Sequence, residues 1–286
     1  MIEWPKVILP PTFDYPFKDL FGRVEILSSF MAAALNEEES RFAGMVIADP
    51  NLNPEHEGDK HTIPDIRAKV PGLHMALEMQ RVYTPIASSR ELYRMGRMMV
   101  DGVKAGDGYW VMPRVVLVLI AEEFLLHPGD DRYHHCCRFA DDITGLPYPN
   151  SPEMHTLELL KLGGCDGTPL WWWMSFMKAR TPEEFAAVAG KGGVMAEAVA
   201  RLMEFSADEK ERLRAEARER FLMDQVALRS MGLAEGLAKG KAEGKAEGKA
   251  EVARQLLRMK MPLIDIVIAT GLSEAEVKRL AAEANQ

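Results

Sequence analysis

The chain is poor in cysteine: three among 286 residues, an odd number, with Cys136 and Cys137 adjacent. This pattern excludes the disulfide framework of small secreted proteins. The longest apolar run, residues 115–121, is far shorter than the roughly 20 residues of a membrane-spanning helix. No basic segment followed by an apolar stretch opens the chain, so we expect no signal peptide. We therefore expect a cytoplasmic protein that does not associate with membranes.

Several functional motifs are also absent. The sequence has no phosphate-binding P-loop, and the glycines of "KGGV" (191–194) follow no strand. The serine-hydrolase nucleophile elbow is missing too. The run His134-His135-Cys136-Cys137 offers metal-ligand residue types. Because neighbouring strand residues face opposite sides of a sheet, we interpret this run as a core or edge strand rather than a tetrahedral metal site.

A net charge of −8 argues against a protein that coats nucleic acid through bulk electrostatics. The charge is uneven, however. Residues 60–114 contain nine Lys or Arg against five Asp or Glu. This window could form a basic face that binds phosphates, or an ordinary solvated face of mixed charge.

The pattern of apolar residues predicts an α/β core of about 165 residues. Residues 12–35 are predicted to be a loop that leads into one helix. A second helix is predicted over 88–106, with Ser88 or Ser89 as its N-cap. The segment that begins at Arg114 is rich in β-branched residues, which is typical of a buried central strand. Further strands are predicted at 42–48, 63–70, 73–80, 135–141 and 155–162.

The remainder of the chain is predicted to be helical. The Trp171–Trp173 triplet could form an aromatic binding surface, but packing of a helix onto the sheet is the favoured interpretation. Residues 232–251 carry a glycine at every fourth position, which predicts a helical tether that frays, because each such glycine costs about 1 kcal/mol. Residues 252–286 should form a helical pair, in which Gly271 ends the first helix and Ser273 with Glu276 forms a capping box for the second.

The two strands at 63–70 and 73–80 contain two acids that should meet. The dipeptide Pro71-Gly72 marks a tight turn. Counting outward from it places Asp65 opposite Glu78, where like charges repel. Opposed residues lie about 4.5–5.5 Å apart at their Cβ atoms, so one small divalent cation could bind both carboxylates. The alternative is an exposed strand face with both acids in water. Gln80 would face the same space and could orient a water or a phosphate oxygen.

Five motifs occur in one order along the chain, and together they carry a resemblance. They are "DYPFKDLFG" (14–22), "PDIRAK" (64–69), "LEMQ" (77–80), "RELYRMGRMM" (90–99) and "LELLKL" (157–162). The chain resembles the transposase-type PD-(D/E)XK nucleases, the recombination-promoting nuclease group, over about residues 10–165. The glycine-periodic tail is similar to tails in that group.

The resemblance implies a metal site. It assigns Asp65, Glu78 and the main-chain carbonyl of Met79 as ligands of Mg²⁺, for which Mn²⁺ can substitute. The lysine that most of the superfamily carries falls on Gln80, a replacement that the group itself shows. Because Gln lacks a positive charge, activation of water would depend more on the metal.

Four further residues match motifs of the group. Lys18 matches the N-terminal motif together with Asp14, and a salt bridge or cap is as good an interpretation as a catalytic role. Arg90 and Tyr93 match the helical motif; Arg90 could hold a phosphate or pair with an acid.

The expected fold is a restriction-endonuclease-like mixed sheet flanked by helices and followed by a helical C-terminal region. The expected parts are a nuclease-like domain over 1–165, a helical extension over 166–231, the tether over 232–251 and the helical pair over 252–286. The expected function is Mg²⁺-dependent hydrolysis of DNA phosphodiesters, linked to recombination or transposition. The alternative is a catalytically inactive nuclease fold that binds DNA or protein. Whether copies of the chain form a homo-oligomer is left open.

Overall fold

The computed structural model describes residues 4–50, 63–82 and 87–283. The chain divides into two compact units, Met1–Glu219 and Arg220–Gln286. The helices are, in chain order, α1 (Asp14–Phe21), α2 (Val24–Leu35), α3 (Ala87–Val100), α4 (Pro169–Lys178), α5 (Pro182–Ala189), α6 (Gly193–Ala207), α7 (Glu209–Arg258), α8 (Leu263–Thr270) and α9 (Glu274–Glu283). The strands are β1 (Val46–Ile47), β2 (Ile66–Val70), β3 (Leu73–Gln80), β4 (Arg114–Ala121), β5 (His134–Arg138) and β6 (Glu153–Glu158).

The described strands of the first unit form one six-stranded sheet in the order β1-β2-β3-β4-β6-β5. Neighbouring strands from β1 to β3 are antiparallel, β3, β4 and β6 are parallel, and β5 is antiparallel to β6. The sheet is therefore mixed, as predicted. Strand β4 is central and almost wholly buried, which explains its unbroken apolar sequence, since neither of its faces meets water.

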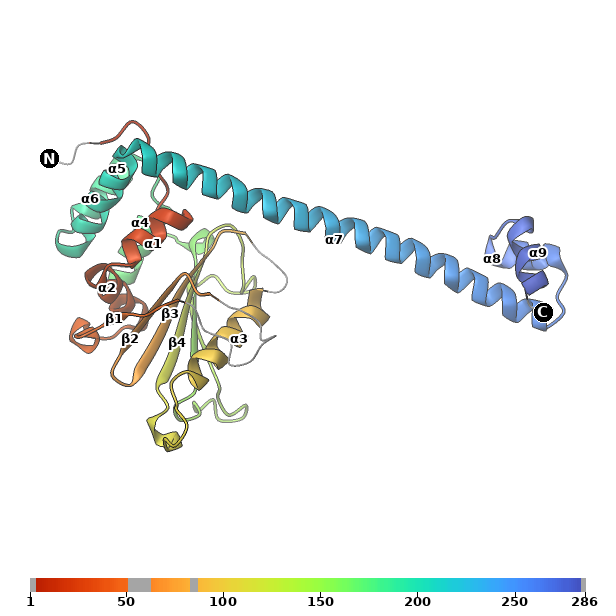
Figure 1. The fold of residues 1–286 in the computed structure, drawn as a ribbon, viewed down its shortest axis with the longest axis horizontal. Helices are drawn as coiled ribbons and strands as arrows, with labels where there is room; N and C mark the ends of the chain where they lie inside the picture. The colour runs from red at the N-terminus through yellow and green to blue at the C-terminus, as the bar shows by residue number, and fades with distance from the viewer. Residues whose placement is uncertain (1–3, 51–62, 83–86, 284–286) are drawn as a thin grey trace. The chain divides into compact units, whose positions relative to one another are not determined.

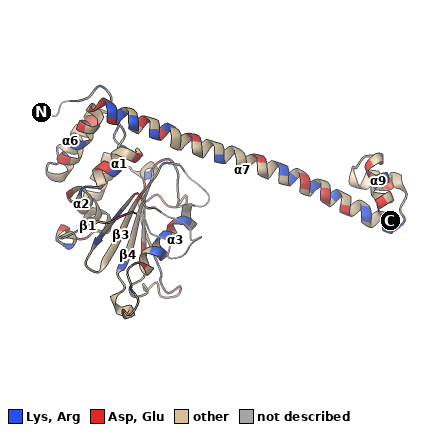
Figure 2. Cartoon of the chain, in the orientation of Figure 1, with Lys and Arg blue, Asp and Glu red and all other residues tan. Residues whose placement is uncertain are grey.

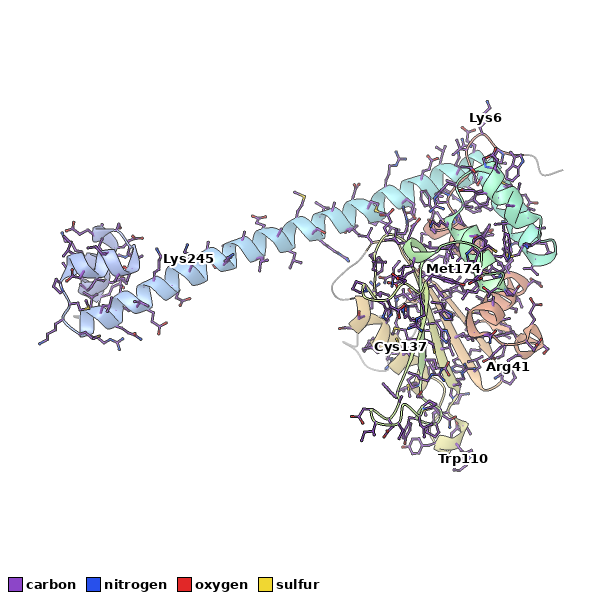
Figure 3. The ribbon with its side chains drawn as sticks, turned by 180° about the vertical axis from the view of Figure 1, so that it is seen from behind. Lys6, Arg41, Trp110, Cys137, Met174 and Lys245 are labelled. Carbon is purple, nitrogen blue, oxygen red and sulfur yellow. The ribbon has the colours of Figure 1, made fainter. Side chains whose placement is uncertain are left out.

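Helices cover both faces of this sheet (Figure 1). Alternate β4 residues, beginning at Val116, belong to the larger core with α1, α2, α4, α5 and α6. The intervening residues, beginning at Val115, pack with Met95 and Met98 of α3. Trp173 is 1% exposed and contacts the rings of Phe21 and Phe30. This residue of the Trp triplet packs in the core as predicted, next to the buried Met174 (Figure 3).

The prediction of a loop that leads into one helix over 12–35 is wrong, because the chain forms two helices, α1 and α2, with a break at Gly22-Arg23. The backbone N–H of Gly22 donates to the carbonyl oxygen of Lys18 at 2.9 Å. A Cβ atom at position 22 would lie only 2.7 Å from that same oxygen. Glycine is therefore required where the first helix ends and the chain turns.

The limits of α3 also differ from the prediction. The helix begins at Ala87, so Ser88 and Ser89 lie inside it and neither is the N-cap. It ends at Val100 rather than 106, and the side chain of the next residue, Asp101, binds Arg67 and Lys69 of β2. That tertiary contact holds the chain at the point where it leaves the helix.

The predicted strands are present with adjusted limits. The strand pair has its turn at Pro71-Gly72, with Val70 paired to Leu73 as predicted. Strand β1 contains only Val46 and Ile47, because the residues before Ala43 form a 3-10 turn. The last strand, β6, ends at Glu158 because the next residues also form a 3-10 turn.

The second unit contains α7 from Arg220 onward, together with α8 and α9. Its small core contains Ala253, Ile266, Val277 and Leu280. Gly271 ends α8 in the left-handed conformation, at φ 62°. Ser273 and Glu276 exchange the two hydrogen bonds of a capping box, so both of these predictions are confirmed.

Helix α7 continues through the glycine-periodic segment without a break. Lysine and arginine alternate with acidic residues along it (Figure 2). No helix among the described residues combines the length and apolar character needed to cross a membrane.

Candidate active site

Asp65 and Glu78 meet across the β2–β3 hairpin. The ladder pairs Ile66 with Leu77, so the next pair outward is Asp65 with Glu78, as the turn predicts. The backbone N–H of Asp65 donates to Glu78 Oε1 at 3.2 Å, and the N–H of Met79 donates to Asp65 Oδ2 at 2.9 Å. Both carboxylates are thus oriented by the backbone of the opposite strand.

Both acids lie in an environment that disfavours their charge. The side chain of Glu78 is 3% exposed and that of Asp65 is 23% exposed. Burial, followed by the charge of Asp65, raises the pKa of Glu78 well above its usual value. Burial also raises the pKa of Asp65, although the N–H of Met79 and the charge of Lys18 oppose the change. The pair therefore favours a bound proton or a bound cation.

Lys18 of α1 lies beside this pair. Its Nζ is 2.6 Å from Asp14 Oδ1 and 3.6 Å from Asp65 Oδ1. Burial opposes the charge of Lys18, but the hydrogen bond to Asp14 and the charge of Asp65 leave its pKa above the usual value. Asp14 in turn binds Arg218 of α7 at 3.1 Å. The salt bridge that the sequence left open is therefore present, and it brings Lys18 to the carboxylates.

Gln80 follows Glu78 on the same face of β3 and is 7% exposed. Its Nε2 donates to Glu91 Oε1 of α3 at 3.2 Å. Its other polar atom, Oε1, is buried and has no hydrogen-bond partner among the residues that the structure describes. A buried acceptor of this kind is suited to a water or a polar ligand.

Glu91 and Arg94 also belong to this cluster, and the sequence interpretation missed both. Arg94 Nη1 lies 2.6 Å from Glu78 Oε2 and 2.9 Å from Glu91 Oε2. Glu91 is fully buried. The only signal in the sequence is their spacing of three residues, which places both on one face of a helix. That they face Glu78 depends on how α3 packs against the sheet.

The two other predicted helix residues lie nearer the surface. Arg90 is 38% exposed and its Nε is 3.3 Å from Glu91 Oε1, so it pairs with an acid. Tyr93 is 37% exposed. Several other cations of the 60–114 window are held in ion pairs: Arg67 with Asp101, Arg81 with Glu122 and Glu219, and Arg114 with Glu37 and Glu153. These pairs support the mixed-charge interpretation of that window.

The donor set suits a hard divalent cation. Asp65 and Glu78 offer carboxylate oxygens, and Gln80 adds an amide oxygen without a described partner. Oxygen donors of this kind are those that Mg²⁺ and Mn²⁺ prefer. The raised pKa values of both acids agree with this fit, because a cation would offset the charge that burial leaves uncompensated.

The sequence model of a family described as "PD-(D/E)XK nuclease family transposase" matches residues 11–230. The match includes all of the site residues described above, from Asp14 to Arg218. No curated protein and no solved structure matches the chain.

Proposed function

The chain belongs to the PD-(D/E)XK nuclease family transposases, and we propose on this premise that it is an endonuclease that hydrolyses DNA phosphodiesters with Mg²⁺, or with Mn²⁺ in its place. The observation that carries the proposal is the opposition of Asp65 and Glu78 across β2 and β3, with the pKa of each raised. Such a pair is unfavourable in a protein without a cation. A role in recombination or transposition forms part of the same proposal.

Each residue has a distinct proposed role. Asp65, Glu78 and the Met79 carbonyl hold the cation, which supplies the positive charge that activates water and stabilises the phosphoryl oxygens. Gln80 orients the attacking water through its Oε1 atom. Lys18, 39% exposed and 3.6 Å from Asp65, binds the DNA phosphate. Arg90 and Tyr93, at the partly exposed surface of α3, contact the DNA backbone farther from the reacting bond.

The second candidate is an inactive nuclease fold that binds DNA or protein. The observation that favours it is the contact of 2.6 Å between Arg94 and Glu78, which already supplies a positive charge to this carboxylate. In that case Arg94 would be a permanent structural partner, and no cation would be needed.

Cleavage of supercoiled plasmid by the full chain separates these candidates. We expect nicking that requires Mg²⁺ or Mn²⁺, that Glu78→Ala abolishes, and that the exposed loop control Asp142→Asn leaves unchanged. Circular dichroism of each variant shows whether it is folded. A folded wild type that binds plasmid in a gel-shift experiment without cutting it would support the inactive module instead.

A further inference from the structure

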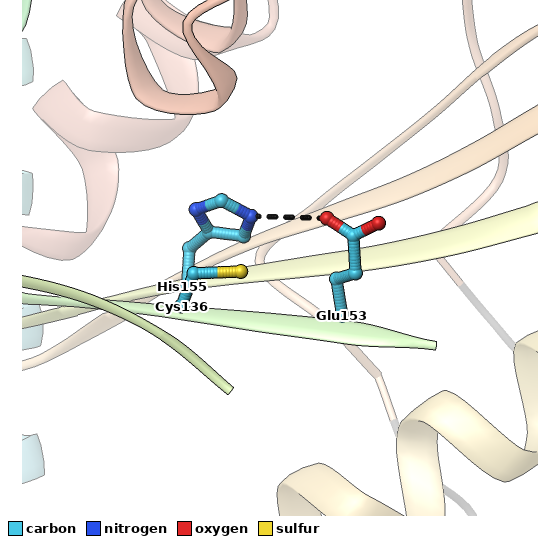
Figure 4. Close-up of side chains that lie close together, drawn as sticks. All are labelled: Cys136, Glu153 and His155. Carbon is cyan, nitrogen blue, oxygen red and sulfur yellow. Dashed lines mark hydrogen bonds and ion pairs between the residues drawn. The ribbon is translucent and has the colours of Figure 1, made fainter. Parts of the chain in front are cut away.

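A second group of metal-ligand residues lies on the other face of the sheet. Cys136 of β5 pairs with His155 of β6, and Glu153 lies two residues before His155 on the same face. Their Sγ, imidazole nitrogen and carboxylate oxygen all lie within 4.8 Å of one another (Figure 4). In the strand register, Glu78 lies level with Leu119 and Thr156, so His155, the neighbour of Thr156, faces away from the carboxylate pair.

His134 holds the imidazole of His155 in place. Its Nε2 is 2.9 Å from His155 Nδ1, and the two rings stack with centroids 5.1 Å apart. This contact leaves His155 Nε2 directed toward Glu153, at 3.5 Å. An imidazole held through its second nitrogen is the usual arrangement of a metal-bound histidine.

Glu153 has a competing partner. Arg114 donates to its Oε1 and Oε2, each at 3.0 Å, and also binds Glu37. The carboxylate is therefore a weaker donor than a free one, so the thiolate and the imidazole would supply most of the affinity. That ligand pair favours Zn²⁺ and related cations over Mg²⁺.

We propose that Cys136, His155 and Glu153 bind a divalent cation of the Zn²⁺ class, independently of the nuclease site. The three ligands leave a fourth position for water. Binding requires the Cys136 thiol to release its proton to solvent. In the described sheet, β5 is an edge strand that pairs only with β6, and the cation would link these two strands through their side chains.

Co²⁺ is a suitable probe, because a cobalt–thiolate bond gives a charge-transfer absorption in the near ultraviolet. We expect the metal-free full chain to develop this band with one equivalent of Co²⁺ and to lose it when Zn²⁺ is added. Cys136→Ser should abolish the band. The matched control is Cys137→Ser, since Cys137 is also exposed but faces the other side of the strand. Glu78→Ala should keep the band, which separates this site from the nuclease site.

Alkylation of the wild type gives a second test that needs no variant. Zn²⁺ should protect Cys136 from iodoacetamide while Cys137 and Cys165, both exposed, remain reactive, as peptide mass spectrometry can show. The proposal is overturned if the wild type shows no cobalt–thiolate band, if the band persists in Cys136→Ser, or if Zn²⁺ protects all three cysteines equally.

Discussion

The carboxylate pairs Glu37–Glu153 and Asp65–Glu78 have opposite electrostatic environments. Between Glu37 and Glu153 lies Arg114, which binds both. Burial disfavours the charge of Glu153, but the hydrogen bond and charge of Arg114 leave its pKa below the usual value. Among the residues that the structure describes, no single cation bridges Asp65 and Glu78 in this way. Each of these acids accepts a backbone N–H of the opposite strand, and the pKa of both is raised.

The difference lies in how the nearby arginine is shared. Arg114 is placed between its two acids, whereas Arg94 binds Glu78 and Glu91 and leaves Asp65 to Lys18 at 3.6 Å. A cation that is fully committed to one acid pair makes a structural bridge. An incompletely compensated pair, by contrast, retains affinity for a further cation. The comparison therefore separates a stabilising ion pair from a candidate metal site.

The largest expected effect on stability follows from removing the structural bridge. Arg114→Ala leaves Glu37 and Glu153 without their shared partner. Because the arginine side chain is 30% exposed, we expect the free energy of unfolding to fall by about 1–3 kcal/mol, less than for a fully buried pair. Urea denaturation measures this loss. The control Arg132→Ala removes an exposed ion pair and should leave stability nearly unchanged; an equal loss in both variants would contradict the bridge.

Substitutions of Gln80 test whether the site at Asp65 and Glu78 is catalytic. Gln80→Leu removes the Oε1 acceptor and should slow metal-dependent plasmid nicking by about tenfold or more, equivalent to about 1.4 kcal/mol in the barrier. Gln80→Lys should retain activity, because lysine restores the charge that most of the superfamily carries there. Initial rates of nicking at saturating Mg²⁺ compare the three proteins. A leucine variant that cuts as fast as the wild type would exclude position 80 from the reaction.

Glu78 and Glu153 should also respond oppositely to pH. An acid whose pKa is raised on folding binds more protons in the native state, so its contribution to stability falls as pH rises above the unfolded value of about 4. An acid whose pKa is lowered stabilises the native state above the unfolded value, and this contribution is lost as pH falls below about 4. Without metal, Glu78→Gln should therefore gain stability relative to wild type as pH rises from about 4 to 7, whereas the loss caused by Glu153→Gln should be complete over that range and should shrink below about pH 4. Urea denaturation at several pH values measures both differences, and differences of the same sign at pH 7 would contradict the contrast.

The smallest expected effect is that of Asp65→Asn without metal. The substitution removes one of two like charges, and the amide oxygen can still accept the Met79 N–H. We expect stability in EDTA to be unchanged or higher by tenths of a kcal/mol, up to about 1. Millimolar Mn²⁺ should raise the melting temperature of the wild type, because it binds only the native state, and should barely change that of the variant. A wild type indifferent to Mn²⁺, or a variant that melts far below it in EDTA, would exclude this metal site.

Local chemistry in the sequence is enough to predict the β2–β3 hairpin and its two acids. Pro71-Gly72 sets the turn, and the period of two along a strand then places Asp65 opposite Glu78. The sequence also predicts the buried strand β4, because its apolar run indicates burial on both faces, and the capping box of α9. Each of these features depends on residues that lie close together in the chain, so the spacing of residues is sufficient to predict it.

Contacts between distant segments were decided only by the tertiary structure. The end of α3 depends on the contact of Asp101 with β2. The placement of Arg94 against Glu78 depends on how a helix packs on a sheet. The meeting of Cys136 with His155 requires the pairing of β5 with β6. The period of two along a strand predicts which of its residues share a face of the sheet. It does not predict which strand pairs with it, because strand pairing depends on the packing of the whole core.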